Sequence, residues 1–187
     1  MNFLLIHLGK LISTLTKLAG RAGATWPGHI ALKLKPDFLH NLEKQLPQGS
    51  IVLSGTNGKT TTALMIASIL RHSGLKVLHN ASGANMTNGI ASSLILDTNF
   101  WGKPKSDIAV FEIDEANLPP ALKSFKPETI LLLNLSRDQL DRYGEVEIML
   151  EKWSESLKKL PNDVNLILNK DDKRIITLAD KFAGKTK

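Results

Sequence analysis

The chain has 187 residues, of which 42% are hydrophobic, and it carries a formal net charge of +6 and no cysteine. This composition can bury one core and excludes a disulfide-stapled scaffold, which suits a reducing cytoplasm. The basic residues are dispersed, and only one tyrosine and three tryptophans are available for stacking, so a nucleic-acid-binding protein is disfavoured.

The first predicted helix is amphipathic and basic. Its leucines are spaced four and three residues apart, which places five of them on one face (Leu4, Leu8, Leu11, Leu15 and Leu18). Such a stripe is typical of a helix that packs on its own domain; the alternative is a face for a membrane surface or a partner. Residues 1–35 hold five Lys or Arg and no Asp or Glu, which suits an anionic bilayer. His7 and Lys10 interrupt the apolar run long before the roughly 18 residues of a membrane span, so neither a transmembrane segment nor a signal peptide is predicted.

A second short helix is expected between Pro36 and Leu46, and strands and helices alternate from Ser50 onward. This alternation predicts an α/β fold with a doubly wound, largely parallel sheet. The expected division is an N-terminal helical segment over 1–48 and one α/β domain over 49–187. Strands are expected at 50–54, 76–79, 107–113, 129–134 and 164–168, and helices at 60–72, 88–97, 117–124, 145–159 and 172–183.

The glycine-rich run 54–62 lies between a short apolar strand and an apolar helix. In that context Gly55 and Gly58 let backbone amides converge on phosphate oxygens, and the N-terminus of the helix adds free N–H groups. Lys59 is placed to reach the β- and γ-phosphates, and the Thr60 hydroxyl to ligate Mg²⁺. The alternative, a solvated turn with an exposed lysine, leaves the flanking strand and helix unexplained. The predicted nucleotide-binding residues are Gly55, Thr56, Asn57, Gly58, Lys59, Thr60 and Thr61.

Three other segments follow predicted strands at their carboxyl ends, where open α/β sheets bind ligands. Segment 80–94 is rich in Asn, Ser and Gly; its alternative is a solvated connection without a role. Segment 107–116 ends in three carboxylates, Glu112, Asp114 and Glu115. These are suitable Mg²⁺ ligands, although an acidic strand end is also a common helix N-cap. Segment 129–145 is an apolar strand followed by a polar loop.

The compact loop Gly-Thr-Asn-Gly-Lys-Thr-Thr has Leu53 where other phosphate loops place their first glycine, and it resembles the loop of the Mur ligase superfamily. Members are ATP-dependent enzymes that join a carboxylate to an amine, and the three other segments resemble the same family. The resemblance implies that Glu112 binds the magnesium that bridges the ATP phosphates, so Lys59 and Glu112 are the expected catalytic residues and Thr60 and Glu112 the metal ligands. The family's Asn…Asp pattern falls on Asn134 and Asp138, which we expect at the nucleotide.

Gln139 stands where the amino-acid-adding members carry a histidine near a second metal. A glutamine amide is a poorer metal ligand than imidazole, which argues against a standard second metal site. The run 137–145, Arg-Asp-Gln-Leu-Asp-Arg-Tyr-Gly-Glu, instead resembles one branch, the synthetase subunits of lipid II isoglutaminyl synthase.

That resemblance implies ATP- and Mg²⁺-dependent amidation of the D-glutamate α-carboxylate of lipid II to D-isoglutamine through an acyl phosphate, in peptidoglycan biosynthesis. The implied partner is a GatD-type glutaminase that supplies ammonia, and the implied location is the cytoplasm, peripherally at the inner face of the membrane. The branch has longer chains with a four-cysteine zinc ribbon, so we expect an N-terminal fragment that ends within the Mur ligase central domain. The alternatives are another Mur-type amino-acid or folylpolyglutamate ligase, or a non-catalytic ATP-binding fragment.

Overall fold

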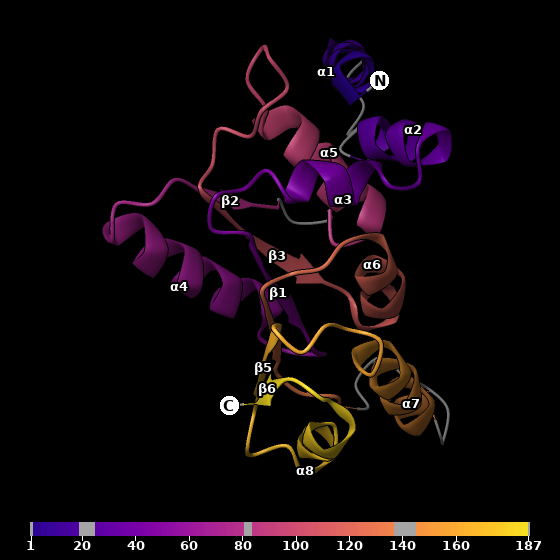
Figure 1. Cartoon of the computed structure of the whole chain (residues 1–187), viewed down its shortest axis with the longest axis vertical. Coiled ribbons are helices and arrows are strands. Elements are labelled where there is room, and N and C mark those ends of the chain that lie inside the picture. Colours follow the sequence, from indigo (N-terminus) through magenta and orange to yellow (C-terminus); the bar gives the residue numbers. More distant parts are fainter. Residues whose placement is uncertain (1, 19–24, 81–83, 137–144, 187) are drawn as a thin grey trace.

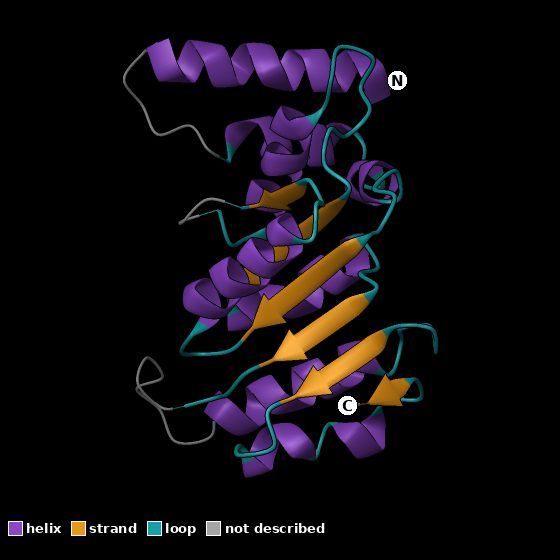
Figure 2. Ribbon diagram, turned by 90° about the vertical axis from the view of Figure 1, so that its left-hand side faces the viewer, coloured by secondary structure: helices purple, strands orange, loops and turns teal. Residues whose placement is uncertain are grey.

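The computed structural model describes residues 2–18, 25–80, 84–136 and 145–186. In this part of the chain, six parallel strands form one sheet in the order β2-β3-β1-β4-β5-β6, which confirms the predicted fold class (Figures 1 and 2). The strands are β1 (Ser50–Ser54), β2 (Val77–His79), β3 (Ile108–Ile113), β4 (Thr129–Leu132), β5 (Asn165–Leu168) and β6 (Lys185–Thr186).

The described helices lie before, between and after the strands. They are α1 (Asn2–Leu18), α2 (Trp26–Leu34), α3 (Phe38–Glu43), α4 (Lys59–His72), α5 (Thr87–Asp97), α6 (Leu118–Ser124), α7 (Glu145–Leu157) and α8 (Lys173–Ile176), with 3₁₀ turns η1 (Glu115–Asn117) and η2 (Ala179–Lys181). From β1 to β5, the predicted elements are confirmed to within two residues at each end.

The strand order decides which face each helix covers. The connection from β1 to β2 runs toward one edge of the sheet, whereas each later connection runs toward the other edge. Because such crossovers are right-handed, α4 lies alone on one face and the other connecting helices cover the opposite face (Figure 1). The buried residues divide accordingly: a small cluster joins α4 to Leu53 and Val110, and a large one contains Val52, Phe111 and Ile130.

The register places the loops after β1, β3 and β4 at the same edge. β1 lies between β3 and β4 and pairs with both, so that Ser54 is opposite Ile113 on one side and Leu132 on the other. All of β3 is buried, as expected for a strand with both faces covered. The phosphate loop follows β1 and the carboxylates Asp114 and Glu115 follow β3. Because β1 and β3 are neighbouring strands, the loop and these carboxylates lie side by side.

The predicted packing of the first helix is wrong. α1 packs on α2 and α5 through Leu5, Ile6, Gly9 and Ser13, which are its buried residues. A Cβ at Gly9 would lie 3.0 Å from Cγ2 of Ile95, so the small residues allow α1 to approach α5 closely. The five-leucine stripe lies on the opposite side and is exposed.

The helix α2 was not predicted from the sequence, although Pro27 in its first turn is a common helix-start signal. The second predicted helix is confirmed as the shorter α3. Leu5, Ala31 and Phe38 from these first three helices share the large core with the sheet. The proposed boundary at residues 48 and 49 stays a prediction.

The single helix predicted over 172–183 is wrong. The structure has the one-turn α8, whose N-cap Asp172 accepts hydrogen bonds from the amides of Arg174 and Ile175, then η2 and the short strand β6. Leu178 and Phe182 are buried in the core, and the chain leaves the helical path after Ile176 and reaches the edge of β5, where β6 pairs with it. A two-residue strand has no sequence signal of its own.

Candidate nucleotide site

The phosphate loop joins β1 to α4 through two glycines with positive φ. Gly58, at φ +83°, is the N-cap of α4, and Gly55, at φ +149°, begins the loop. A Cβ at Gly55 would lie 2.9 Å from the carbonyl oxygen of Asn134, so only glycine fits. The loop thus brings backbone N–H groups and the N-terminus of a helix of 14 residues to one place, as phosphate binding requires.

The side chain of Asn134 braces this loop. Its Oδ1 accepts a hydrogen bond from the amide of Asn57 (2.9 Å), and its Nδ2 donates to the Asn57 carbonyl oxygen (3.0 Å). The amide of Thr56 donates to the Asn134 carbonyl oxygen, and the amide of Ser136 donates to the Thr56 hydroxyl. Asn134 is therefore at the predicted site, where both ends of its amide hold the loop backbone.

Lys59 is held between the loop and two carboxylates. Its ammonium donates to the carbonyl oxygens of Gly55 (2.6 Å) and Thr56 (3.3 Å), and lies 3.3 Å from Oε2 of Glu115 and 3.8 Å from Oδ1 of Asp114. These contacts keep the ammonium next to the loop amides. An anionic phosphate at the loop would compete with the two carboxylates for the same charge.

Glu112 lies in β3 opposite Leu53 of β1 and is buried, with 4% of its surface exposed. Among the described residues, its Oε2 has no hydrogen-bond partner. The backbone on both sides is fixed, since Asn80 accepts from the Glu112 amide and donates to the Glu112 carbonyl oxygen, each at 2.9 Å. His79, next to Asn80, also has an unpartnered buried nitrogen, Nε2, and burial lowers its pKa against the opposing effect of Glu112.

The remaining carboxylates follow at the end of β3. Burial raises the pKa of Asp114, opposed by the nearby Lys59, while Glu115 and Glu112 raise it further. The indole of Trp153, fully buried in α7, donates to the Glu115 carbonyl oxygen (2.9 Å) and fixes the start of η1. The acidic segment is therefore held in place from both the sheet and α7.

These residues suit a divalent cation that is bound partly by the protein and partly by phosphate oxygens, rather than one that is enclosed by protein ligands alone. No group of three or more His, Cys, Asp or Glu that could hold a metal occurs among the described residues. Mg²⁺ is commonly bound by one or two carboxylates together with phosphate oxygens and water. The unpartnered oxygen of Glu112 and the exposed hydroxyl-bearing Thr60 at the start of α4 are the donors that suit this arrangement.

Beside the loop, a hollow of about 420 Å³ lies at the carboxyl ends of β4 and β5. Its lining includes Asn134, Asn169 and Asp171, with Lys173 and Arg174 from α8. Because Asn134 belongs to both the hollow and the loop brace, the hollow continues the same edge of the sheet.

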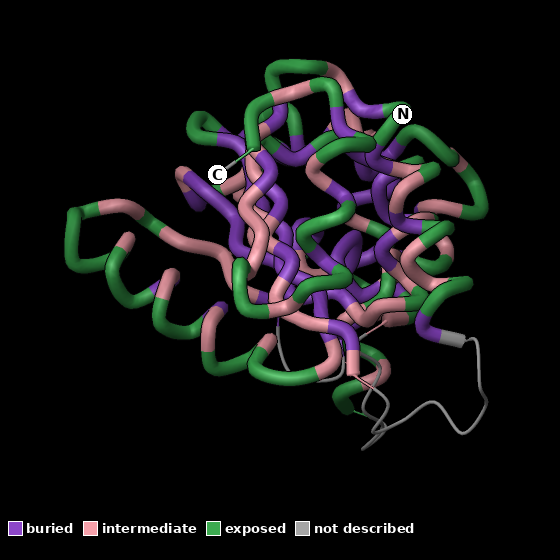
Figure 3. The backbone as a smooth tube through the Cα atoms, turned by 90° about the horizontal axis from the view of Figure 1, so that it is seen from below, coloured by how far each residue is buried: buried purple, intermediate pink, exposed green. Residues whose placement is uncertain are grey.

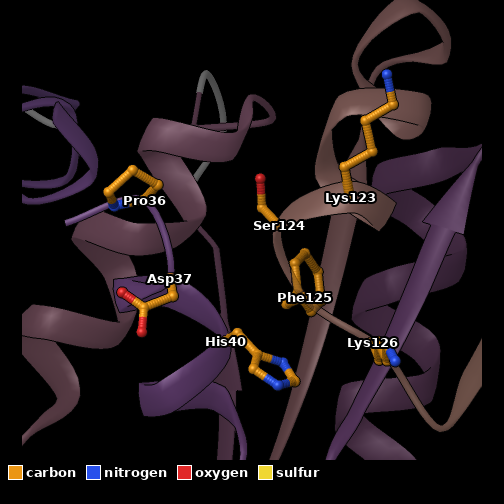
Figure 4. Close-up of a pocket in the computed structure, with 7 residues that line it drawn as sticks. All are labelled: Pro36, Asp37, His40, Lys123, Ser124, Phe125 and Lys126. Atoms are coloured by element: carbon orange, nitrogen blue, oxygen red, sulfur yellow. The ribbon is translucent and has the colours of Figure 1, made fainter.

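A second hollow of about 330 Å³ lies at the opposite edge, near the start of β4 (Figure 4). His40, Lys123 and Lys126 line it together with Phe125. Burial and then the charges of Lys44 and Lys126 lower the pKa of His40. Since ligands of parallel sheets bind at the carboxyl ends of the strands, this hollow is not the candidate site.

The structure thus brings together the predicted phosphate loop, Asn134 and Glu112, and their roles stay predictions. Asp138, and Gln139 next to it, lie outside the described residues. Asn80 and Ser136 lie in two segments that the sequence placed at this edge, but it did not single them out, and it missed Trp153. Asn80 had a signal, because a polar residue directly after a strand at this edge commonly faces the site; the tryptophan in an amphipathic helix had none.

A parallel α/β sheet with a phosphate loop after its central strand, and a buried carboxylate on the adjacent strand, defines a phosphate-loop nucleotide-binding domain. The family model of the Mur ligase middle domain matches residues 53–186. The chain belongs to the Mur ligase family.

Two relatives agree with this membership. The chain is 40% identical over 167 residues to the lipid II isoglutaminyl synthase (glutamine-hydrolyzing) subunit MurT of Staphylococcus aureus, and 37% identical over 172 residues to MurT of Streptococcus pneumoniae. The two matches cover 89% and 87% of this chain, and each covers 37% of the relative. The chain therefore spans little more than a third of these relatives.

The fold also matches MurF ligase of Thermotoga maritima in complex with ADP, with a TM-score of 0.68, 18% identity, and coverage of 86% of this chain and 36% of the other. A bifunctional folylpolyglutamate synthase/dihydrofolate synthase with Mn, AMPPNP and L-glutamate bound matches with a TM-score of 0.58 and 16% identity over 86% of this chain and 46% of that one. These matches show the fold alone.

Proposed function

We propose that this chain is the ATP-binding part of a ligase that amidates the D-glutamate α-carboxylate of lipid II, giving D-isoglutamine through an acyl phosphate. The observation that carries the proposal is the pairing of the braced phosphate loop with the unpartnered carboxylate oxygen of Glu112. The choice of this reaction within the family is supported by the 40% identity to a subunit named for lipid II isoglutaminyl synthesis.

The residues at the site suit phosphoryl transfer from ATP to a carboxylate. The loop amides and Lys59 would hold the phosphates, and Lys59 would exchange its contact with Glu115 for the γ-phosphate. Glu112 and Thr60 would hold Mg²⁺, which, when bound, neutralises charge on the phosphates. This neutralisation matters because a carboxylate resists attack by ammonia until its oxygen has become part of a leaving group.

Ammonia must reach the acyl phosphate unprotonated and before water does. The names of the two relatives include "glutamine-hydrolyzing" and "subunit", which supports a separate glutaminase as the source of ammonia. We therefore propose a GatD-type glutaminase as the partner, with lipid II at the membrane surface as the acceptor and a cytoplasmic, membrane-peripheral location.

A chimera tests this function directly. Residues 1–187 would replace the matching third of Staphylococcus aureus MurT, and lipid II would be incubated with the chimera, its glutaminase, glutamine and Mg²⁺-ATP. We expect mass spectrometry to detect D-isoglutamine with the chimera and not with its Glu112→Gln variant. Addition of an amino acid instead, or no product from a chimera that still binds ATP, would contradict the proposed reaction.

A further inference from the structure

The outer face of α1 is apolar and uncovered. The five leucines of its stripe have exposed fractions of 72, 41, 55, 55 and 80% in chain order (Leu4, Leu8, Leu11, Leu15 and Leu18). The opposite side of the helix holds the small and buried residues that pack on α2 and α5. α1 lies at the end of the molecule farthest from β6 (Figure 2).

A loop before β3 extends this face with two aromatic side chains. Phe100 and Trp101, with exposed fractions of 66 and 75%, lie at its tip. The loop is tied to α1: Lys10 donates to the carbonyl oxygens of Thr98 (2.6 Å) and Asn99 (3.1 Å), and Nε2 of His7 donates to the Phe100 carbonyl oxygen (3.0 Å). The two aromatic residues therefore hold a fixed position beside the stripe.

Phe3 joins the loop to the helix. Its ring contacts that of Phe100 edge to face, with centroids 6.2 Å apart, and Phe100 contacts Trp101 in the same way at 5.4 Å. Phe3 itself is 44% exposed. We call the five leucines, Phe3, Phe100 and Trp101 the outer face.

The exposed charges beside the outer face are mainly positive, and Asp37, near the start of α1, pairs with Lys35, which also donates to Asn2. Lys17 on α1, and Lys103 and Lys105 on the loop, are exposed, and the sequence has no acidic residue before Asp37. Asp97 at the base of the loop is already used, because its carboxylate accepts hydrogen bonds from the amides of Lys105 and Ser106. The surroundings of the outer face therefore attract anions.

We propose that the outer face of α1 and its loop binds the surface of an anionic lipid bilayer, with the leucines and aromatic rings at the acyl boundary and the lysines at the headgroups. Leucine with Trp and Phe on one side and lysine at the flanks is the composition of helices that lie in the interface. None of the described helices is long and apolar enough to cross a membrane.

A second copy of the chain is the less suitable occupant. Two copies joined through this face would bring two lysine-rimmed surfaces together in molecules that each carry a net charge of +6. An anionic bilayer gains from the same charges instead. Each lysine near such a surface contributes attraction that salt screens.

Vesicle flotation of the 187-residue chain tests the proposal. The probes are vesicles of phosphatidylcholine with roughly one third phosphatidylglycerol, and vesicles of phosphatidylcholine alone. We expect the chain to float with the anionic vesicles and to be released by about 0.5 M salt. Changing Lys17 and Lys103 to glutamine should lower the anionic partition about tenfold.

Two triple variants distinguish binding through the outer face from non-specific adsorption of any exposed apolar surface. Leu4→Gln, Leu11→Gln and Leu15→Gln remove the stripe, and we expect the partition to fall about tenfold or more. The control removes three other exposed apolar side chains, from α4, and should float like the parent (Leu64→Gln, Met65→Gln and Ile69→Gln). Circular dichroism shows that each variant is folded, and Trp101→Ser, at an exposed loop tip, gives a milder second variant with the same direction.

Each result decides the matter. Flotation that depends on the stripe and on phosphatidylglycerol, and not on α4, supports membrane binding. Absence of flotation by the parent chain overturns it, as does equal loss in both triple variants. If the parent chain does not bind vesicles but forms a dimer in sedimentation velocity, and the three leucine changes dissociate that dimer, the face binds a second copy of the chain instead. These readouts need no ATP or acceptor, so they stand apart from the proposed amidation.

Discussion

At the scale of single residues, the burial of Glu112 links the stability of the chain to the proposed binding of a cation. A buried carboxylate oxygen without a partner is costly in the free chain, and a cation would satisfy it. The Lys59 ammonium is already engaged by Glu115 and the loop carbonyls. The arrangement therefore favours the chain with a bound cation over the chain without one.

Changing Glu112 to glutamine should have opposite effects on stability and binding. We expect the free energy of unfolding of the ligand-free chain to rise by about 1 kcal/mol, because a buried charge is removed. Magnesium-dependent nucleotide affinity should fall about tenfold, since a hard ligand is lost. Urea denaturation and magnesium titrations in the presence of nucleotide measure the two effects. Gln139→Ala is the control, and an equal loss in both variants would mean that the cation has been misplaced.

A second buried carboxylate, Glu43, predicts a dependence of stability on pH. It lies at the end of α3, accepts a hydrogen bond from the Ser50 hydroxyl (2.6 Å), and has its pKa raised to about 7, chiefly by burial. Glu128 also raises this pKa, and the Ser50 hydrogen bond and Lys44 oppose the shift. Because the folded chain holds this proton more tightly than the unfolded chain, stability is lost as the pH rises from about 4.5 through 7.

Glu43→Gln should remove that loss. The variant should match the parent near pH 4 and exceed its free energy of unfolding by about 3 kcal/mol near pH 8. Urea denaturation at the two pH values measures the difference. A gap between variant and parent that stays constant with pH would show that Glu43 titrates normally in the folded chain.

At the scale of elements, the phosphate loop was predictable because strand, glycines, lysine and helix follow one another in the sequence. The sequence predicts that Asn134 lies at the site, but not that its side-chain amide bonds to the backbone of Asn57. Those hydrogen bonds depend on the register between β1 and β4, which the sequence does not show. The leucine stripe of α1 was read from its spacing, but spacing does not say which side packs. The packing side is the one that carries Gly9, whose lack of a side chain allows close approach to Ile95 of α5.

At the scale of the whole molecule, the described part of the chain covers one face of the sheet with α4, whose own outer side is exposed. α4 stands alone on that face and is exposed or half-buried along most of its length (Figure 3). Its side chains Leu64, Met65 and Ile69 are 49, 60 and 67% exposed, although apolar helix faces are normally buried. The 187-residue chain therefore exposes a second apolar surface, on the side of α4.

We expect this surface to cause self-association of the isolated chain at high concentration. The triple change of Leu64, Met65 and Ile69 to glutamine should lower the apparent mass in light scattering toward that of the monomer. It should leave the thermal midpoint nearly unchanged, because these side chains bury little surface in the free chain. An apparent mass that is the same for parent and variant would show that α4 is not the contact.

The central claim, a Mg²⁺-ATP site built on the loop 55–61, is tested most directly by calorimetric titration of Mg²⁺-ATP into the chain and its Lys59→Ala variant. The account predicts that the parent binds and that the variant binds about tenfold to a hundredfold more weakly, because a charge-assisted contact to phosphate is lost. Lys123→Ala, at the opposite edge of the sheet, should bind like the parent. Unchanged affinity in a folded Lys59→Ala variant would contradict the account.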